Sequence, residues 1–182
     1  MTFRLFRSLA PPVRFGLLAL ALYLLWVGGY EHYLAADGRL DAVLSHNLAH
    51  TSGAVLRGLG FEASVSDTLI PVISLAQQPV LRIWPECNGL VLYALFGGFI
   101  VAFVGPVRSK LWFVPLGMAL IYCLNVVRLV ALCLNAHYAH QTVEFNHHYT
   151  FTFLVYASIF GLWMWWAARL AQPRPSASAY SV

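Results

Sequence analysis

The chain has 182 residues, of which 60% are hydrophobic and only 10% are charged. Soluble globular domains carry about 25% charged residues, so a chain of this composition could not cover a water-facing surface with charge. The net charge of +4 comes from basic residues that stand singly or in pairs beside apolar runs. This distribution argues against a nucleic-acid-binding face and favours a membrane protein.

Four apolar segments approach or exceed the ~20 residues that are needed to cross a hydrocarbon core about 30 Å thick. They cover residues 15–33, 89–107, 111–134 and 149–168. The first follows a short basic stretch, as in a signal peptide, but its apolar run continues through Tyr30 without a small-residue cleavage site. We therefore expect an uncleaved first span and an all-α polytopic membrane protein with about four transmembrane helices.

The basic residues are distributed unevenly between the segments that connect these spans. If the N-terminus is cytoplasmic, the short cytoplasmic segments hold Arg4, Arg7, Arg14, Arg108, Lys110, Arg169 and Arg174. The longer external segments hold Arg39, Arg57 and Arg82. The positive-inside rule therefore predicts a multi-pass protein of the cytoplasmic (inner) membrane with both termini in the cytoplasm. Residues 1–172 would form one membrane-embedded domain, and the Pro/Ser/Ala-rich residues 173–182 a disordered cytoplasmic tail.

The external segment, residues 31–86, contains a different pattern. Apolar residues recur at helical spacing opposite a polar face, which predicts an amphipathic helix lying in the outer interface of the membrane. Its apolar positions are Leu40, Val43, Leu44, Leu48, Val55 and Leu59, and its polar positions are Arg39, Ser45, His46 and Arg57. Two β-prone runs, 68–75 and 79–84, then flank Ala76-Gln77-Gln78 and indicate a small β-hairpin that leads into the second span.

Cys87, Cys123 and Cys133 are the cysteines of the chain, an odd number without a CxxC pair. This spacing argues against a disulfide framework or a structural zinc site, and we expect Cys123 and Cys133 to be small buried hydrophobes. Cys87 differs because Pro85 and Gly89 punctuate the backbone on either side of it. We expect its thiol at a helix N-terminus, where the helix dipole lowers a thiol pKa from ~8.5 toward neutrality. The alternative is an interfacial cysteine without a role.

Asn125 and Arg128 interrupt the third apolar span. An arginine at the centre of a span costs about 2.5–3.5 kcal/mol on insertion scales, and such residues usually mark function. At 1.5 Å per residue from Lys110, Arg128 lies about 26 Å along the span, near its outer edge. Asn125, Arg128 and Asn135 share one helix face, so the outer end carries a polar stripe. The alternative is an arginine that only reaches toward lipid headgroups, which would not require Asn125.

His147 and His148 directly precede the fourth span. An imidazole titrates near neutral pH and can pair with a thiol, although a histidine at the membrane surface is often incidental. In the predicted topology a thiol, a permanent cation and an imidazole from three different spans all reach the outer face. Cysteine-peptidase chemistry needs a thiolate paired with an imidazolium, and a cation or donor that stabilises the oxyanion. The combination predicts a cysteine peptidase or transpeptidase site.

Three short motifs, in the same order and at the same ends of spans, resemble those of the exosortase/archaeosortase family. They are Glu86–Leu90, Asn125–Leu129 and the segment from His147 through Phe151 to Tyr156. The resemblance covers about residues 68–168. Asn88 is a departure, because family members often have a serine after the cysteine. The resemblance implies a membrane-embedded cysteine peptidase or transpeptidase that cleaves C-terminal sorting signals through a thioester intermediate.

The resemblance also implies roles for single residues and for partners. Cys87 would be the nucleophile, Arg128 the stabilising cation and His147 the general acid/base, with His148 as the alternative histidine. The residues that would support them are Glu86, Asn88 and Asn125. The substrate would be a membrane-tethered exported protein that ends in an apolar helix and a basic tail, processed at the outer face of the bilayer. No metal, cofactor or nucleic acid is implied.

Two other functions are compatible with parts of the sequence. His46 and His50, spaced i,i+4, and His137 and His140, spaced i,i+3, could share a metal or haem, although zinc-activated hydrolysis normally needs a third ligand. Sensitivity to chelators would separate this function from a thiol enzyme. Gly97-Gly98 and the tryptophan-rich residues 163–166 would also suit helix packing and interfacial anchoring in a non-enzymatic assembly factor or transporter.

Overall fold

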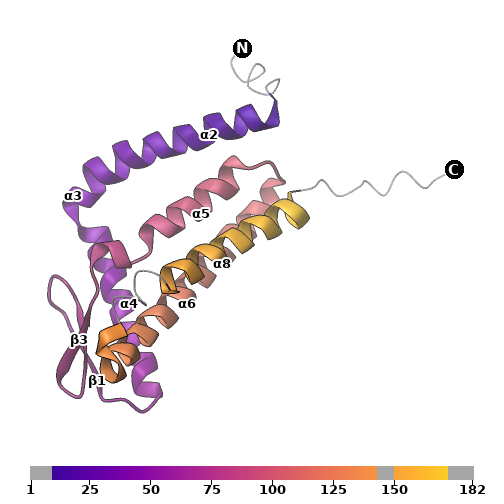
Figure 1. The fold of residues 1–182 in the computed structure, drawn as a ribbon. Coiled ribbons are helices and arrows are strands. Elements are labelled where there is room, and N and C mark those ends of the chain that lie inside the picture. The colour runs from indigo at the N-terminus through magenta and orange to yellow at the C-terminus, as the bar shows by residue number, and fades with distance from the viewer. Residues whose placement is uncertain (1–9, 143–149, 172–182) are drawn as a thin grey trace.

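The computed structural model describes residues 10–142 and 150–171. Long helices lie beside one another, and a small antiparallel sheet lies at one end of them (Figure 1). The elements in chain order are α2 (Pro11–Leu25), η1 (Trp26–Leu34), α3 (Ala35–Asp37), α4 (Arg39–Gly58), β1 (Ala63–Ser66), β2 (Val72–Leu75), β3 (Gln78–Arg82), η2 (Pro85–Cys87), α5 (Leu90–Ala102), α6 (Val107–Tyr138), η3 (His140–Thr142), α8 (Phe151–Trp165) and η5 (Trp166–Leu170). The tail predicted over residues 173–182 lies outside the described residues.

Three helical stretches within the described residues are long and apolar enough to cross a membrane: Pro11–Asp37, Val107–Tyr138 and Thr152–Leu170. They match the first, third and fourth predicted spans, so the prediction of a helical polytopic membrane protein is confirmed. The predicted second span differs, because α5 has only 13 residues. At 1.5 Å per residue it is about 20 Å long, shorter than a hydrocarbon core of about 30 Å. The helix ends at Ala102 because Phe103 is extended, and the next helix begins only after Pro106.

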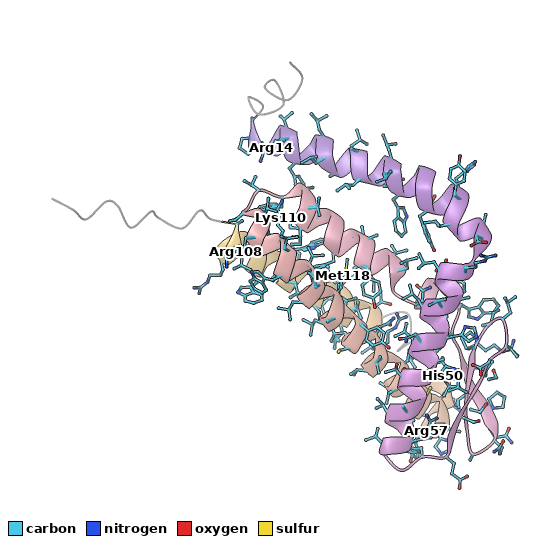
Figure 2. All side chains as sticks on the ribbon, turned by 180° about the vertical axis from the view of Figure 1, so that it is seen from behind. Arg14, His50, Arg57, Arg108, Lys110 and Met118 are labelled. Carbon is cyan, nitrogen blue, oxygen red and sulfur yellow. The ribbon has the colours of Figure 1, made fainter. Side chains whose placement is uncertain are left out.

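The long helices alternate in direction, so their connections fall at two opposite ends. Arg14, Arg108 and Lys110 lie at one end, whereas His50 and Arg57 lie at the other (Figure 2). The Lys110 ammonium donates hydrogen bonds of 2.8 Å to the carbonyl of Val101 in the last turn of α5 and of 2.7 Å to that of Phe103, which fixes the connection between α5 and α6. Three of the cations that are predicted to be cytoplasmic, Arg14, Arg108 and Lys110, therefore lie at the same end of the described helices.

Helix α6 has 32 residues and joins two apolar clusters. Its first part packs with α5 and α8 in a cluster that we call the membrane layer, whose buried members include Phe96, Ile100, Phe113, Ile121, Ile159 and Trp166. Its last part packs with α4 and the sheet in the outer layer, whose buried members include Leu48, Leu56, Ile73, Ile83, Leu129 and Cys133. At 1.5 Å per residue α6 is about 48 Å long, so its last turns can hold the outer layer beyond a hydrocarbon core of about 30 Å.

Helix α4 lies where the sequence predicts an amphipathic helix, but the rest of the protein covers a different face from the apolar one. Its buried residues are Asp41, Ser45, Leu48, Ala49, Ser52, Gly53 and Leu56. The apolar residues Leu40, Val43, Val55 and Leu59 are not covered by protein. The contact of this face with the membrane interface stays a prediction, and the small residues face the sheet instead. Close packing is the reason, since a Cβ on Gly53 would lie only 2.8 Å from Cγ2 of Val65 in β1. Small residues let α4 meet the sheet.

The predicted hairpin is present as β2 and β3, and β1 adds a third strand that the pattern did not indicate. Leu75 pairs with Gln78, and the residues between them, Ala76 and Gln77, have φ angles of 48° and 64°. Positive φ at both central residues characterises a type I′ turn, whose twist matches that of the flanking strands. Ile73 and Leu75 are buried in the outer layer, so the sheet packs against α4 and α6 and leads directly into the segment before α5.

Candidate active site

The segment from residue 83 to residue 89 connects β3 to α5 and carries Cys87. Ile83 is buried, and its N–H donates to the carbonyl of Pro71 at 3.0 Å, which ties the start of the segment to the sheet. The N–H of Cys87 donates to the carbonyl of Trp84 at 2.9 Å and closes the short turn η2. Gly89 has a φ of 83°, a value that favours glycine, and passes the chain into α5. We call residues 85–89 the cysteine turn.

The cysteine turn does not place the thiol at the start of α5. The helix begins at Leu90, whose N–H donates to the side-chain oxygen of Asn88 at 2.9 Å. Burial raises the pKa of the Cys87 thiol above its ordinary value, the Arg128 guanidinium acts to lower it, and the Glu86 carboxylate raises it further. The expected fall in the thiol pKa is therefore wrong, because burial outweighs the nearby positive charge and because Gly89, not Cys87, is the N-cap of α5.

Helix α6 contacts the cysteine turn through its polar stripe. Asn125 is almost fully buried, and its Nδ2 donates to the carbonyl of Cys87 at 3.1 Å. The same amide lies so close to Gly89 that a Cβ there would be 3.1 Å from Nδ2. Arg128 follows one helical turn later and acts on the charge of the Cys87 thiol. The stripe predicted from the sequence thus faces the backbone and the side chain of the same cysteine.

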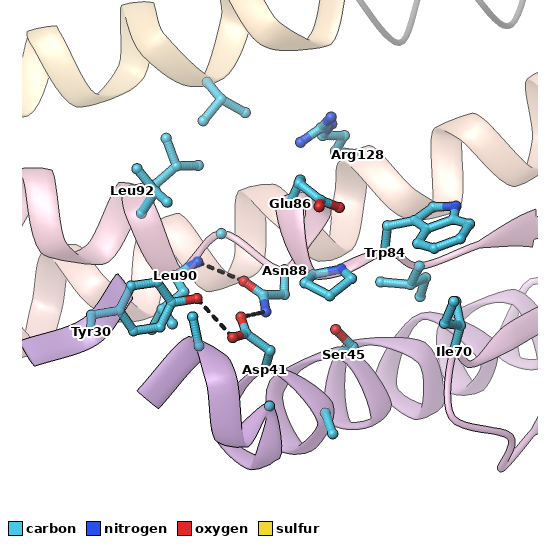
Figure 3. Close-up of a pocket in the computed structure, with 18 of the residues that line it drawn as sticks. Tyr30, Asp41, Ser45, Ile70, Trp84, Glu86, Asn88, Leu90, Leu92 and Arg128 are labelled. Carbon is cyan, nitrogen blue, oxygen red and sulfur yellow. Dashed lines mark hydrogen bonds between the residues drawn. The ribbon is translucent and has the colours of Figure 1, made fainter. Parts of the chain in front are cut away.

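Helix α4 contacts the cysteine turn from another side through a buried carboxylate. Asp41 is 5% exposed, and its Oδ1 accepts a hydrogen bond of 2.7 Å from Nδ2 of Asn88 (Figure 3). Its Oδ2 accepts a second hydrogen bond, also 2.7 Å, from the hydroxyl of Tyr30 in η1. Asn88 is fully buried, so both of its amide atoms are satisfied within the protein, by Asp41 and by the backbone of Leu90.

A cavity of about 860 Å³ lies at the junction of the membrane layer and the outer layer. Its walls come from η1, α4, the loop between β1 and β2, the cysteine turn, α5, α6 and α8. The charged residues among those that line it are Asp41, Glu86 and Arg128. Cys87 is adjacent in sequence to two lining residues but does not itself line the cavity, since it is half-buried against the outer layer. A molecule in the cavity would therefore meet the Arg128 guanidinium directly.

Five residues that the sequence singled out come together at this junction: Glu86, Cys87, Asn88, Asn125 and Arg128. The other two, His147 and His148, lie outside the described residues. The chain resumes in α8, whose first turns line the cavity with Thr152, Val155 and Tyr156.

Sequence reasoning missed Asp41 and Tyr30. Asp41 lies one helical turn before Ser45, on the small-residue face of α4 that turned out to be buried. An acidic residue on a face rich in alanine, serine and glycine is a signal that could have identified it, once those small residues were recognised as packing positions. Tyr30 gave no such signal, because an aromatic residue near the end of an apolar span is common at membrane interfaces.

Replacing Glu86 with glutamine is expected to lower the pKa of the Cys87 thiol, since the Glu86 carboxylate raises it. At a pH below the thiol pKa, a larger fraction of thiolate would then react, and alkylation of Cys87 by membrane-permeable iodoacetamide would be faster. The pH profile of the alkylation rate should shift to lower pH. Glu62→Gln, at an exposed acidic residue before β1, is the control and should leave the profile unchanged. An unshifted profile in Glu86→Gln would show that the Glu86 carboxylate does not raise the pKa of the Cys87 thiol.

Three of the histidines that could have shared a metal, His46, His50 and His137, make other contacts. Nδ1 of His46 lies 2.7 Å from the carbonyl of Ala42, and Nε2 of His50 lies 2.7 Å from a carboxylate oxygen of Asp67. The His137 ring packs edge-on against Phe61. In the part of the chain that the structure describes, no group of three or more His, Cys, Asp or Glu residues is arranged to hold a metal ion.

Comparison with known proteins gives a family for the chain. The sequence model of the transmembrane exosortases matches residues 3–166, which include the cysteine turn, the polar stripe of α6 and all of α8. Comparison with curated proteins and comparison with solved structures each gave no match. The family match covers well over half of the chain and agrees with its membrane-spanning helices. The chain therefore belongs to the transmembrane exosortase family, whose members are membrane-embedded sorting transpeptidases.

Proposed function

We propose that the chain is a cysteine peptidase or transpeptidase in which Cys87 is the nucleophile, Arg128 the stabilising cation and His147 the general acid/base, with His148 as the alternative. The observation that supports this most directly is the action of the Arg128 guanidinium on the Cys87 thiol across two separate elements, beside a cavity. Asn125 supports the same pair, because it fixes the backbone of Cys87 from one turn away on α6. A merely interfacial cysteine would need neither residue.

The raised pKa of Cys87 fits a nucleophile that is protonated until a base removes its proton. In the proposed reaction the imidazole takes the thiol proton, and the sulfur attacks a peptide carbonyl carbon. The Arg128 guanidinium stabilises the oxyanion. The carbon–nitrogen bond then breaks, and the imidazolium gives its proton to the leaving amine. The thioester passes its acyl group to an acceptor amine, another acceptor or water.

The orientation in the membrane follows from charge. Arg14, Arg108 and Lys110 lie at one end of the helices (Figure 2), and the positive-inside rule assigns that end to the cytoplasm. Arg128 lies 21 residues beyond Val107 in the same helix, which is about 32 Å at 1.5 Å per residue and therefore at the far surface of the hydrocarbon core. The site then faces the outside of the cytoplasmic membrane, with both ends of the chain inside.

The proposed substrate is a membrane-tethered exported protein that ends in an apolar helix and a basic tail. The cavity supports this because its walls combine two environments. The first turns of α5 and α8 contribute apolar residues such as Leu92 and Val155 from the membrane layer, and α4 and the cysteine turn contribute polar ones. A peptide that leaves the membrane at this point would pass Arg128 and Cys87 just outside the hydrocarbon core.

Trapping of a thioester tests the proposed function. The probe is an epitope-tagged exported protein from the same cells that ends in an apolar helix and a basic tail, co-expressed with the full-length enzyme. Wild type should give a reporter–enzyme adduct that hydroxylamine releases, and Cys87→Ala should give none. Cys123→Ala, at a cysteine exposed on α6, is the matched control and should retain the adduct. A hydroxylamine-sensitive adduct that persists in Cys87→Ala would overturn the proposal.

A further inference from the structure

The Asp41 carboxylate is a buried charge with one partner on each oxygen, and it joins three separate elements. Its partners are the Tyr30 hydroxyl in η1 and the Asn88 amide in the cysteine turn, each at 2.7 Å (Figure 3). A buried carboxylate is costly to a fold unless hydrogen bonds compensate it. Because Asp41 is only 5% exposed, we ask which part of the structure its carboxylate stabilises, and its hydrogen bonds indicate the cysteine turn.

Asp41 determines how the Asn88 side chain is oriented. An asparagine amide has a donor end and an acceptor end, and only the acceptor end can receive the N–H of Leu90. Because a carboxylate accepts and cannot donate, Asp41 holds the Nδ2 end of Asn88 and directs Oδ1 to the Leu90 N–H at 2.9 Å. The carboxylate thus fixes the first N–H of α5, that of Leu90, through an intermediate side chain.

The cysteine turn is consequently held from two sides. On one side, Asp41 of α4 holds Asn88, and on the other, Asn125 of α6 holds the carbonyl of Cys87 at 3.1 Å. Since Cys87 and Asn88 are consecutive, rotation of the Asn88 backbone would displace the thiol relative to Arg128. A displacement of about 1 Å in a reacting group can cost about 10²-fold in rate.

We propose that Asp41 is a positioning residue of the cysteine site, which holds the cysteine turn in its reactive geometry through Asn88 without contacting the reacting atoms. The proposal rests on the proposed function, in which Cys87 is the nucleophile. It assigns Asp41 an effect on kcat, because the carboxylate acts on the geometry of the turn. It leaves KM unchanged although Asp41 lines the cavity, because both carboxylate oxygens are already bonded to Tyr30 and Asn88. The proposal also predicts that the residues at positions 41 and 88 must match, since one side chain has to donate the hydrogen bond that the other accepts.

An exchange of the two side chains tests this dependence. Asn88→Asp alone sets two carboxylates against each other, and Asp41→Ala alone removes the acceptor; each should lower kcat about 10²-fold with KM unchanged. The double variant Asp41→Asn/Asn88→Asp restores every hydrogen bond, because an amide now donates to a carboxylate that also accepts from Leu90. It should recover at least about 10-fold of the loss, a coupling that only interacting residues show.

The measurements use the full-length enzyme in vesicles that contain the tagged reporter, at equal amounts of folded protein. Ser52→Ala is the matched control, since Ser52 is fully buried on the same face of α4, its hydroxyl has no partner among the described residues, and it does not line the cavity. It should behave as wild type. A double variant no better than Asn88→Asp, or a loss carried by KM, would overturn the proposal.

Cys87→Ala separates this inference from the proposed function on which it rests. If Cys87→Ala still processes the reporter, the cysteine mechanism itself is wrong. If Cys87→Ala is inactive while Asp41→Ala keeps the kcat of wild type, only the positioning role fails. If Asp41→Ala does not accumulate as folded protein, the exchange variant still tests the positioning role. It keeps side chains of the same size at both positions and leaves the donor of one opposite the acceptor of the other.

Discussion

Replacing Arg128 with alanine is expected to lower processing of the tagged reporter by about 10²–10³-fold, the loss that follows removal of one oxyanion donor. The expectation has two physical sources. Arg128 lines the cavity, where the tetrahedral oxyanion would form. Its guanidinium also acts to lower the pKa of the Cys87 thiol, against the effect of burial, which raises it. Without the guanidinium the pKa of Cys87 should rise further, so the pH profile of its alkylation should shift to higher pH.

Two variants sharpen this test. Arg128→Lys keeps a positive charge but lacks the planar fork of the guanidinium. It should restore the thiol pKa more fully than the processing rate, which would separate the effect on the thiolate from the effect on the oxyanion. Arg82→Ala, at an exposed arginine of β3, is the control and should change neither. Normal processing by Arg128→Ala would remove Arg128 from the mechanism, even if the thiol pKa shifted as expected.

The membrane helices could be predicted from the sequence because hydropathy and length alone define them. Three of the four predicted spans are helices of sufficient length. The distance of Arg128 from Lys110 along α6 could be predicted as well, since a helix rises by a fixed ~1.5 Å per residue. The shortness of α5 could not, because its apolar run continues past Ala102 and the extended backbone of Phe103 ends the helix.

The face of α4 and the state of the cysteine depended on tertiary contacts that periodicity does not encode. Leucines and valines marked the apolar face, yet the helix buries Ala49, Ser52 and Gly53 where the sheet approaches closely. The sequence predicts a fall in the thiol pKa at a helix N-terminus, but Gly89 is the N-cap of α5 and burial of the thiol dominates. Asp41 and Asn88 are 47 residues apart, and no local pattern relates an acid in one helix to an amide before another.

Replacing Gly117 with alanine is expected to destabilise the membrane layer strongly. Gly117 is buried on α6, and a Cβ there would overlap the ring of Phe96 on α5. Phe96 is fully buried among apolar neighbours, so its ring has little room to move. Overpacking of this kind typically costs about 1–3 kcal/mol and sometimes more. The thermal midpoint of the detergent-solubilised protein and the yield of folded protein in membranes should both fall.

A compensating change identifies the contact as the cause. Phe96→Leu in the Gly117→Ala background removes the ring that the new methyl group meets, and it should recover most of the lost stability. Gly161→Ala is the matched control, because a Cβ on this glycine of α8 would have nothing within 4 Å. If Gly117→Ala were as stable as wild type, α5 and α6 would not be packed as closely as described. The distance between these helices matters for the site, since α5 begins at the cysteine turn and α6 carries Asn125 and Arg128. A variant that separates them should therefore lose processing along with stability, and Phe96→Leu should restore the two together.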